Sequence, residues 1–336
     1  MVEGSGTRAG RRRALASCVL AALGAALTVA LLHVPPAAAA QKPPTAAEVE
    51  RLTERFLEGL REPATRGGGG VGVGGDDPPT EKDPPLLSKN GIAVALYGAP
   101  QLTATAVGKR SPQGAGRKLR KQARAYARRT DRPVTRSINL IGVIATATSG
   151  GDGKYRARQA DSVIRTYLKR ARAVGGRLTL DIQPGRSPII RELRALKRWI
   201  ELPDVDVGID PEWNVGRKGV PGRDDGSIRH KELNRASRWI EKLVDAEDLP
   251  PKAVIVHQFR EGSVRGRRKI KQRDGARVLL NFDGIGSRGA KRAGYKNLAQ
   301  PGLLDGFSLF YDRDSKLLSP RGVLRLRPKV DYAMYQ

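Results

Sequence analysis

The sequence has little cysteine, little histidine and few aromatic side chains. Its one cysteine, Cys18, lies in an apolar leader, so the chain beyond that leader has no thiol. This excludes disulfide bonds, thiolate metal sites and a cysteine nucleophile from the rest of the chain. Three histidines in 336 residues argue against a histidine-rich metal site. A domain of this composition has to be held together by its hydrophobic core.

Acidic residues are scarce relative to basic ones. The chain has 62 Lys and Arg against 34 Asp and Glu, a formal net charge of +28. A field of this sign favours polyanionic partners. If the protein is exported, the nearby polyanions are cell-wall polymers and anionic lipid, so we expect an anionic wall polymer as partner and no nucleic acid. The alternative is that the basic residues only keep helix faces soluble.

Residues 1–40 have the order of a secretory signal. Residues 11–13 are arginines, residues 14–32 are largely apolar, and residues 37–40 are alanines that offer a cleavage site before Gln41. We therefore predict a cleaved signal peptide and a secreted or cell-surface protein. The alternative is an uncleaved anchor, because the apolar stretch is long enough for a marginal span. Only in that case would the chain contact a membrane.

Two short segments precede the main domain. Residues 41–62 place apolar side chains at helical spacing and predict a short amphipathic helix. Residues 63–90 contain a run of glycines and paired prolines, a composition that predicts a disordered linker. The remaining residues, 91–336, have the size of a large barrel domain.

From residue 91 onward, short β-rich runs alternate with basic helical patterns. Helical patterns occupy residues 156–175, 187–202 and 230–247. The eight β-rich runs occupy residues 91–98, 138–148, 177–183, 205–213, 252–259, 276–283, 306–312 and 330–336. This alternation predicts parallel βαβ units, and eight of them predict an α/β fold, a (β/α)8 TIM-like barrel that lacks the last helix. An open doubly wound sheet is the alternative.

The C-terminal ends of the eight runs are polar. Barrel enzymes build their sites there, and side chains alternate between the two faces of a strand. We expect the inward-facing polar groups to share one mouth, where they would bind substrate. Any one acidic group could instead cap a helix or pair with an arginine. The expected substrate-binding residues are Tyr97, Asp181, Gln183, Trp213, His257, Asn281, Asp283 and Asp312.

The fourth run ends in Asp210-Pro211-Glu212. Residues two apart on a strand share a face, so these carboxylates would lie about 6–7 Å apart. A carboxylate near another one in a partly dry pocket has a raised pKa and can act as a general acid. That is the chemistry of glycoside hydrolysis. Trp213 could stack on a sugar ring or could seal the core.

This D-x-E at the end of a fourth barrel strand resembles that of chitinase-type hydrolases and of barrel-fold N-acetylmuramidases. The resemblance implies that Glu212 is the acid/base and that Asp210 orients an acetamido group of the substrate. It covers only the segment around residues 205–213 and departs from the chitinase pattern D-x-x-D-x-D-x-E at Val205 and Gly208. More broadly, the chain resembles secreted barrel proteins of high-GC Gram-positive bacteria.

The sequence thus predicts a secreted or cell-surface glycoside hydrolase that acts on cell-wall polysaccharide by carboxylate acid/base catalysis, with no cofactor and no metal. The alternative is a non-catalytic barrel that binds an anionic cell-wall polymer through its basic surface. A Ca²⁺ or Mg²⁺ site made of Asp181, Asp210 and Asp283 is a further alternative. The glycine pattern at residues 284–289 is interpreted as a tight turn rather than a nucleotide site.

Overall fold

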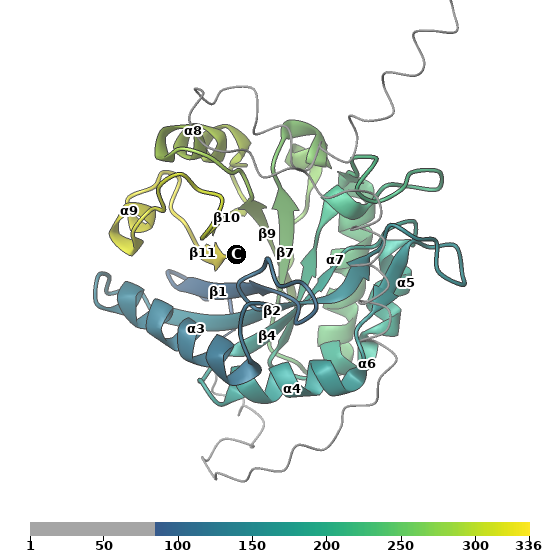
Figure 1. The fold of residues 1–336 in the computed structure, drawn as a ribbon, viewed down its shortest axis with the longest axis horizontal. Coiled ribbons are helices and arrows are strands. Elements are labelled where there is room, and N and C mark those ends of the chain that lie inside the picture. The colour runs from purple at the N-terminus through teal and green to yellow at the C-terminus, as the bar shows by residue number, and fades with distance from the viewer. Residues whose placement is uncertain (1–84) are drawn as a thin grey trace, which may run out of the picture.

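The computed structural model describes residues 85–336, and within them eight parallel strands form a closed barrel (Figure 1). Around the barrel the order is β1, β2, β4, β5, β7, β9, β10 and β11, and β11 pairs with β1. Each predicted run overlaps one of these strands, although β2 and β10 begin before their runs, so the closed parallel barrel is confirmed and the open sheet is excluded. The strands are β1 (Ile92–Gly98), β2 (Val134–Ala145), β4 (Arg177–Ile182), β5 (Val205–Ile209), β7 (Lys252–Gln258), β9 (Ala276–Phe282), β10 (Leu304–Leu309) and β11 (Tyr332–Tyr335).

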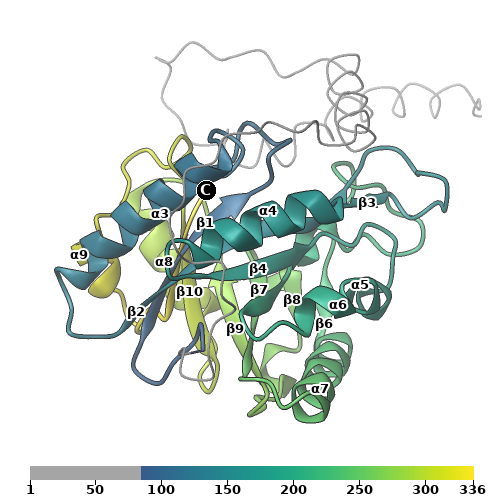
Figure 2. The ribbon, with the colours of Figure 1, turned by 90° about the horizontal axis from the view of Figure 1, so that it is seen from below.

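Helices lie around the outside of the strands (Figures 1 and 2). The hydroxyls of Ser111, Ser287 and Ser319 cap the N-termini of α3, α8 and α9, which fixes where these helices begin. In the described part of the chain no helix is long and apolar enough to cross a membrane. The helices are α3 (Pro112–Ala127), α4 (Asp161–Arg172), α5 (Ile189–Ala195), α6 (Lys197–Ile200), α7 (His230–Ala246), α8 (Arg288–Leu298) and α9 (Pro320–Leu324).

Three details depart from a regular alternation of strand and helix. The pattern at 187–202 forms two helices, because the backbone leaves the helical conformation at Leu196. β3 (Arg156–Arg158) is an added antiparallel partner of β2. Between β7 and β9 there is no α-helix, only the turns η2 (Glu261–Ser263) and η3 (Arg267–Lys269) and the short β8 (Val264–Arg265). The long α7 also packs on β9 and covers that side of the barrel.

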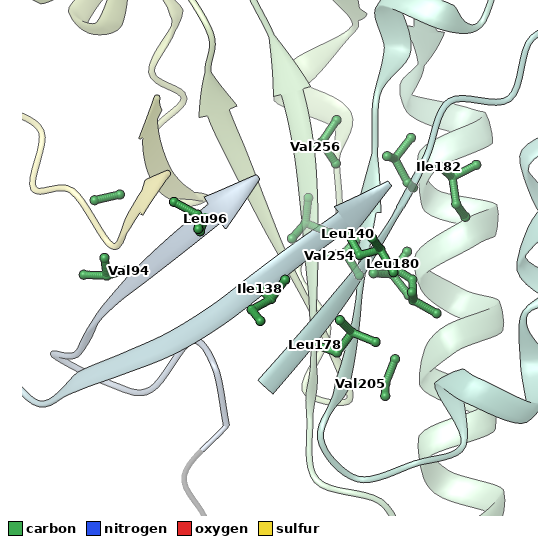
Figure 3. Close-up of a cluster of buried hydrophobic side chains, with 14 of the residues drawn as sticks. Val94, Leu96, Ile138, Leu140, Leu178, Leu180, Ile182, Val205, Val254 and Val256 are labelled. Carbon is green, nitrogen blue, oxygen red and sulfur yellow. The ribbon is translucent and has the colours of Figure 1, made fainter. Parts of the chain in front are cut away.

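The strands present aliphatic side chains to the helices. On β4 and β5 the alternation predicts Leu178, Leu180 and Ile182, and Val205, Val207 and Ile209, as this outer face, and all six belong to the main hydrophobic cluster. Figure 3 shows part of that cluster between the strands and helices. Each fully buried side chain of this size contributes roughly 1.5–3 kcal/mol. The opposite face of each strand is thereby left to fill the barrel interior.

The floor of the barrel is closed by residues that precede β1. Leu86 and Leu87 are buried against inward-facing Ala93, Ala253 and Leu279. The hydroxyl of Thr135 donates to the Leu86 carbonyl at 2.8 Å, and Arg277 donates to the Leu87 carbonyl at 2.7 Å. The ordered unit therefore begins before Gly91, inside the segment predicted as linker. The predicted signal peptide, the helix at 41–62 and the linker up to residue 84 lie outside the described residues.

A buried ion pair lies above this floor. Asp206 points into the barrel from β5 and accepts hydrogen bonds from Arg177 Nε at 2.7 Å and from the Ala253 amide at 2.8 Å. Both side chains are almost completely buried. Lys252 lies beside them, donates to the Leu202 carbonyl, and has its pKa lowered to about 8 by burial. Three neighbouring strands are thus joined at their N-terminal ends.

We predict that Asp206→Ala lowers the free energy of unfolding by about 3–5 kcal/mol, because it leaves the buried charge of Arg177 without its carboxylate. Urea unfolding followed by circular dichroism measures this. Asp225→Ala is the control, since it removes an exposed partner of Arg260 and should cost less than about 1 kcal/mol. Equal losses in the two variants would contradict the structural role given to Asp206.

Candidate active site at the barrel mouth

The buried imidazole of His257, on β7, lies between two carboxylates. Its Nε2 is 3.1 Å from Asp181 Oδ1 on β4, and its Nδ1 is 2.5 Å from Asp283 Oδ2, just after β9. β7 pairs with β9, and only β5 lies between β7 and β4, so the imidazole links three strands on one side of the barrel interior. The structure therefore brings together three of the side chains that the sequence placed at the mouth.

Tyr97 and Gln183 extend this network to β1 and β2. The Tyr97 hydroxyl donates to Asp181 Oδ2 at 3.4 Å and accepts from Gln183 Nε2 at 3.2 Å. The Gln183 carbonyl oxygen in turn accepts from the Ala145 amide. The Tyr97 ring also packs on His257, with ring centroids 5.6 Å apart. Asp181 is completely buried and therefore has no access to a ligand. Its contacts position the imidazole of His257.

Asp283 has a different environment. It accepts hydrogen bonds from Asn281 Nδ2 at 2.6 Å and from the Ser308 hydroxyl, in addition to His257. Its side chain is 16% exposed, whereas Asp181 is not exposed at all. Several donors thus hold a carboxylate that still reaches the mouth. Sequence analysis did not single out Ser308, although Gly306 and Ser308 alternate there with buried Phe307 and Leu309.

Asp210 and Glu212 follow β5 directly. Asp210 Oδ1 accepts the amide of Glu212 at 3.3 Å, which caps the turn η1 (Pro211–Trp213). Asp210 is 7% exposed, and Glu212 is only partly buried. The two carboxyl groups of the D-x-E therefore differ in access, with Glu212 the one nearer to solvent.

Glycine makes room for the polar interior at two positions. A Cβ added to Gly208 on β5 would lie 2.0 Å from Asp181 Oδ1, and one added to Gly306 on β10 would lie 2.5 Å from Asn281 Oδ1. Neither distance is compatible with a side chain. Gly208, where the sequence departs from the chitinase pattern, is thus the position that admits Asp181.

Charges in the mouth shift several pKa values. Burial alone would lower the pKa of His257, but Asp283 and Asp181 outweigh it and hold this pKa well above 6.5. At a given pH, His257 is therefore protonated more readily than a free imidazole. The contribution of His257 to stability is complete below pH 6.5 and is lost as pH rises through the folded-state pKa.

Burial raises the pKa of Asp210 far above its usual range. His257 opposes this shift, and Asp181 and Glu212 add to it.

Glu212 has the pKa of a proton donor. Burial, with Asp283 and Asp225, raises its pKa from 4.5 to about 7, and His257 and Arg313 oppose the shift. A carboxyl group that titrates near neutral pH, beside a second carboxylate and partly open to solvent, can give and take a proton during a reaction.

The remaining predicted residues lie at different depths. Trp199 is buried in the core and Trp239 packs against it. Trp213 is half-buried and is not among the described side chains that pack on the core clusters. Asp312 is exposed and pairs with Lys109. It is thus separate from the network around His257, while Trp213 lies next to Glu212.

Within residues 85–336 no group of three or more His, Asp or Glu side chains is arranged to hold a metal ion. Asp181 and Asp283 are directed at His257 instead. Comparison of the chain with known protein families and with curated proteins gives no match.

We predict that Gly208→Ala lowers the free energy of unfolding by about 1–3 kcal/mol, because the added methyl group overlaps Asp181 and overpacks the interior. Thermal unfolding measures the change. Gly151→Ala is the control, since Gly151 is exposed and its added Cβ meets nothing within 4 Å. If the two variants melted alike, Asp181 would not be confined as described.

The free energy of unfolding should depend on pH through Glu212. Because the folded-state pKa of Glu212 is about 7 and its ordinary value is 4.5, the folded protein binds more protons than the unfolded chain between these pH values. Glu212 therefore costs stability progressively from pH 4.5 to about 7, and by a constant amount above that.

Glu212→Gln should remove this cost and become more stable than the parent above pH 7, by on the order of 1–3 kcal/mol. The two proteins should converge toward pH 4.5. Urea unfolding of both across this range gives the difference. A difference independent of pH would contradict the raised pKa.

Proposed function

We propose that this protein is a secreted or cell-surface glycoside hydrolase that cleaves cell-wall polysaccharide by carboxylate acid/base catalysis. The observation that carries the proposal is Glu212, a partly exposed carboxyl group at the mouth of a parallel barrel with a pKa raised to about 7. Export is supported only by the order of residues in the N-terminal leader.

The chemistry requires a proton donor and a second carboxylate. Protonated Glu212 would give its proton to the bridging oxygen as the bond from that oxygen to the anomeric carbon breaks. Asp283, which is partly exposed, would face the positive charge that develops on this carbon. A water molecule would then supply its hydroxyl group to the carbon and return its proton to a carboxylate.

The other mouth residues would have supporting roles. His257, Asn281 and Ser308 fix the orientation of Asp283. Asp210 holds the turn that carries Glu212 through its bond to the Glu212 amide. By the resemblance to chitinase-type hydrolases, Asp210 would also orient a substrate acetamido group. Trp213 would offer its ring to the apolar face of a sugar.

The alternative is a barrel that binds anionic wall polymer without cutting it. In this case the carboxyl groups at the mouth would be structural, and no activity would offset the stability cost of Glu212. The strongly basic composition favours this reading independently of the mouth. The two readings differ in what a conservative change at Glu212 does.

We predict that Glu212→Gln abolishes wall-glycan cleavage, by about 10²–10⁴-fold, because it removes the donated proton and keeps the side-chain shape. Activity of the parent should fall as pH rises through about 7, the pKa of Glu212. Release of reducing ends from purified cell wall gives the rates, and glycan binding measured in parallel should be nearly unchanged.

Asp305→Asn is the control, because burial also raises the pKa of Asp305 to about 7, yet Asp305 lies at the N-terminal end of β10, the end opposite to the mouth. This variant should cleave at the parental rate. A parent protein that cleaves no glycan, or a Glu212 variant as active as the parent, would favour the binding barrel.

A further inference from the structure

One helix face carries a continuous row of cations. In α3 and at its C-cap, five exposed basic residues recur at intervals of one helical turn: Arg117, Arg120, Lys121, Arg124 and Arg128. At 100° per residue they fall within about 100° of one another, and they extend along about 16 Å of helix. We call these five residues the α3 row.

The charge of the α3 row is not balanced locally. The helix Pro112–Ala127 contains no acidic residue, and in the described part of the chain none of the five forms an ion pair. Arg120 donates to the Ala173 carbonyl, beyond the end of α4. Figure 2 shows α3 and α4 next to each other on the surface of the barrel. The row therefore lies on an outer face of the fold.

Neighbouring groups respond to this excess of positive charge. Burial lowers the pKa of Lys118, and Arg110 and Lys121 lower it further. Burial likewise lowers the pKa of Arg136, with Arg120 and Arg124 adding to the effect. Cations that repel one another without a protein partner favour bound anions.

We infer that the α3 row binds a linear, flexible phosphodiester polymer of the polyol-phosphate type, lying along the helix. Four of the five residues are arginine, whose planar guanidinium matches phosphate oxygens. The row is straight and lies on one helix face, which suits a single extended strand.

Other polyanionic partners fit less well. The apolar face of α3, with Leu119, Ala123 and Tyr126, is buried in the core, so the helix has no side chains to insert into a lipid surface. The aromatic side chain of α3, Tyr126, is among those buried, and single-stranded nucleic acids depend on exposed aromatic platforms. Because α4 and α9 flank α3 on the barrel surface, α3 does not protrude from the fold as a recognition helix in the groove of a duplex does.

This inference extends the proposed wall-polymer partner and does not depend on catalysis by Glu212. Both could hold, with the α3 row retaining the protein on one polymer while the mouth acts on another. Binding and cleavage can also fail separately, so they are measured in separate assays.

The test compares two variants of the full chain with equal charge change. The first replaces Arg117, Lys121, Arg124 and Arg128 by Gln. The second replaces Lys231, Arg235, Arg238 and Lys242 by Gln; these are exposed on α7 at the same spacing, but α7 also carries Glu232, Glu241 and Asp245. Binding to poly(glycerol phosphate) is measured by calorimetry at several salt concentrations, and circular dichroism verifies folding.

The parent should bind with a steep salt dependence, since log K falls by about 0.7 per phosphate contact in flexible strands for each tenfold rise in salt. The α3 variant should lose about tenfold or more in affinity and should have a shallower salt slope. The α7 variant should stay within about twofold of the parent. Glu212→Gln should bind the polymer like the parent.

Three results would overturn the inference. The parent could fail to bind the polymer. The two Gln variants could lose affinity equally, which would make net charge alone responsible. The parent could also bind anionic phospholipid vesicles or a DNA duplex more tightly than poly(glycerol phosphate) at equal phosphate concentration, with loss in the α3 variant, which would assign the row to a membrane or to nucleic acid.

Discussion

The polar interior of the upper barrel depends on one imidazole placed between two carboxylates. Asp181 is completely buried, and an isolated buried charge costs several kcal/mol even after relaxation. Its contact with the His257 imidazole, 3.1 Å away, offsets that cost, since the pKa of His257 is raised by the two carboxylates. The same imidazole reaches Asp283 at 2.5 Å. One residue thus allows two carboxyl groups to be present, one sealed in the interior and one open to the mouth.

The floor uses a different solution to the same problem. There Asp206 is paired with Arg177, and the leucines at 86 and 87 exclude water below them. The mouth has no such covering segment in the described residues, and Glu212 and Asp283 stay partly exposed. Polar groups at the floor join strands to each other, whereas those at the mouth retain access to solvent. This difference places any chemistry at the C-terminal ends of the strands, as in other barrels.

The sequence predicts the barrel well because its eight β-rich runs are separated by helical patterns, and because a period of two divides each strand into an aliphatic and a polar face. The inward positions of Asp181, His257 and Asp283 follow from that alternation alone. Features that arise only when the barrel closes cannot be seen in this alternation. Leu86 belongs to the floor although glycine and proline surround it, and the connection from β7 to β9 lacks a helix because α7 already covers β9. Ser308 becomes recognisable only through its bond to Asp283.

The electrostatic cost of Glu212 separates a structural from a functional reading of the mouth. Asp181 and Asp206 are carboxylates with cationic partners, and each can be explained by stability alone. Burial and neighbouring carboxylates dominate the pKa shift of Glu212. Because its pKa is raised to about 7, ionisation of Glu212 lowers the stability of the fold. Stability alone would favour glutamine at this position. A group that burdens the fold, at the open end of a barrel and beside a carboxylate held by several donors, is better explained by proton transfer than by packing.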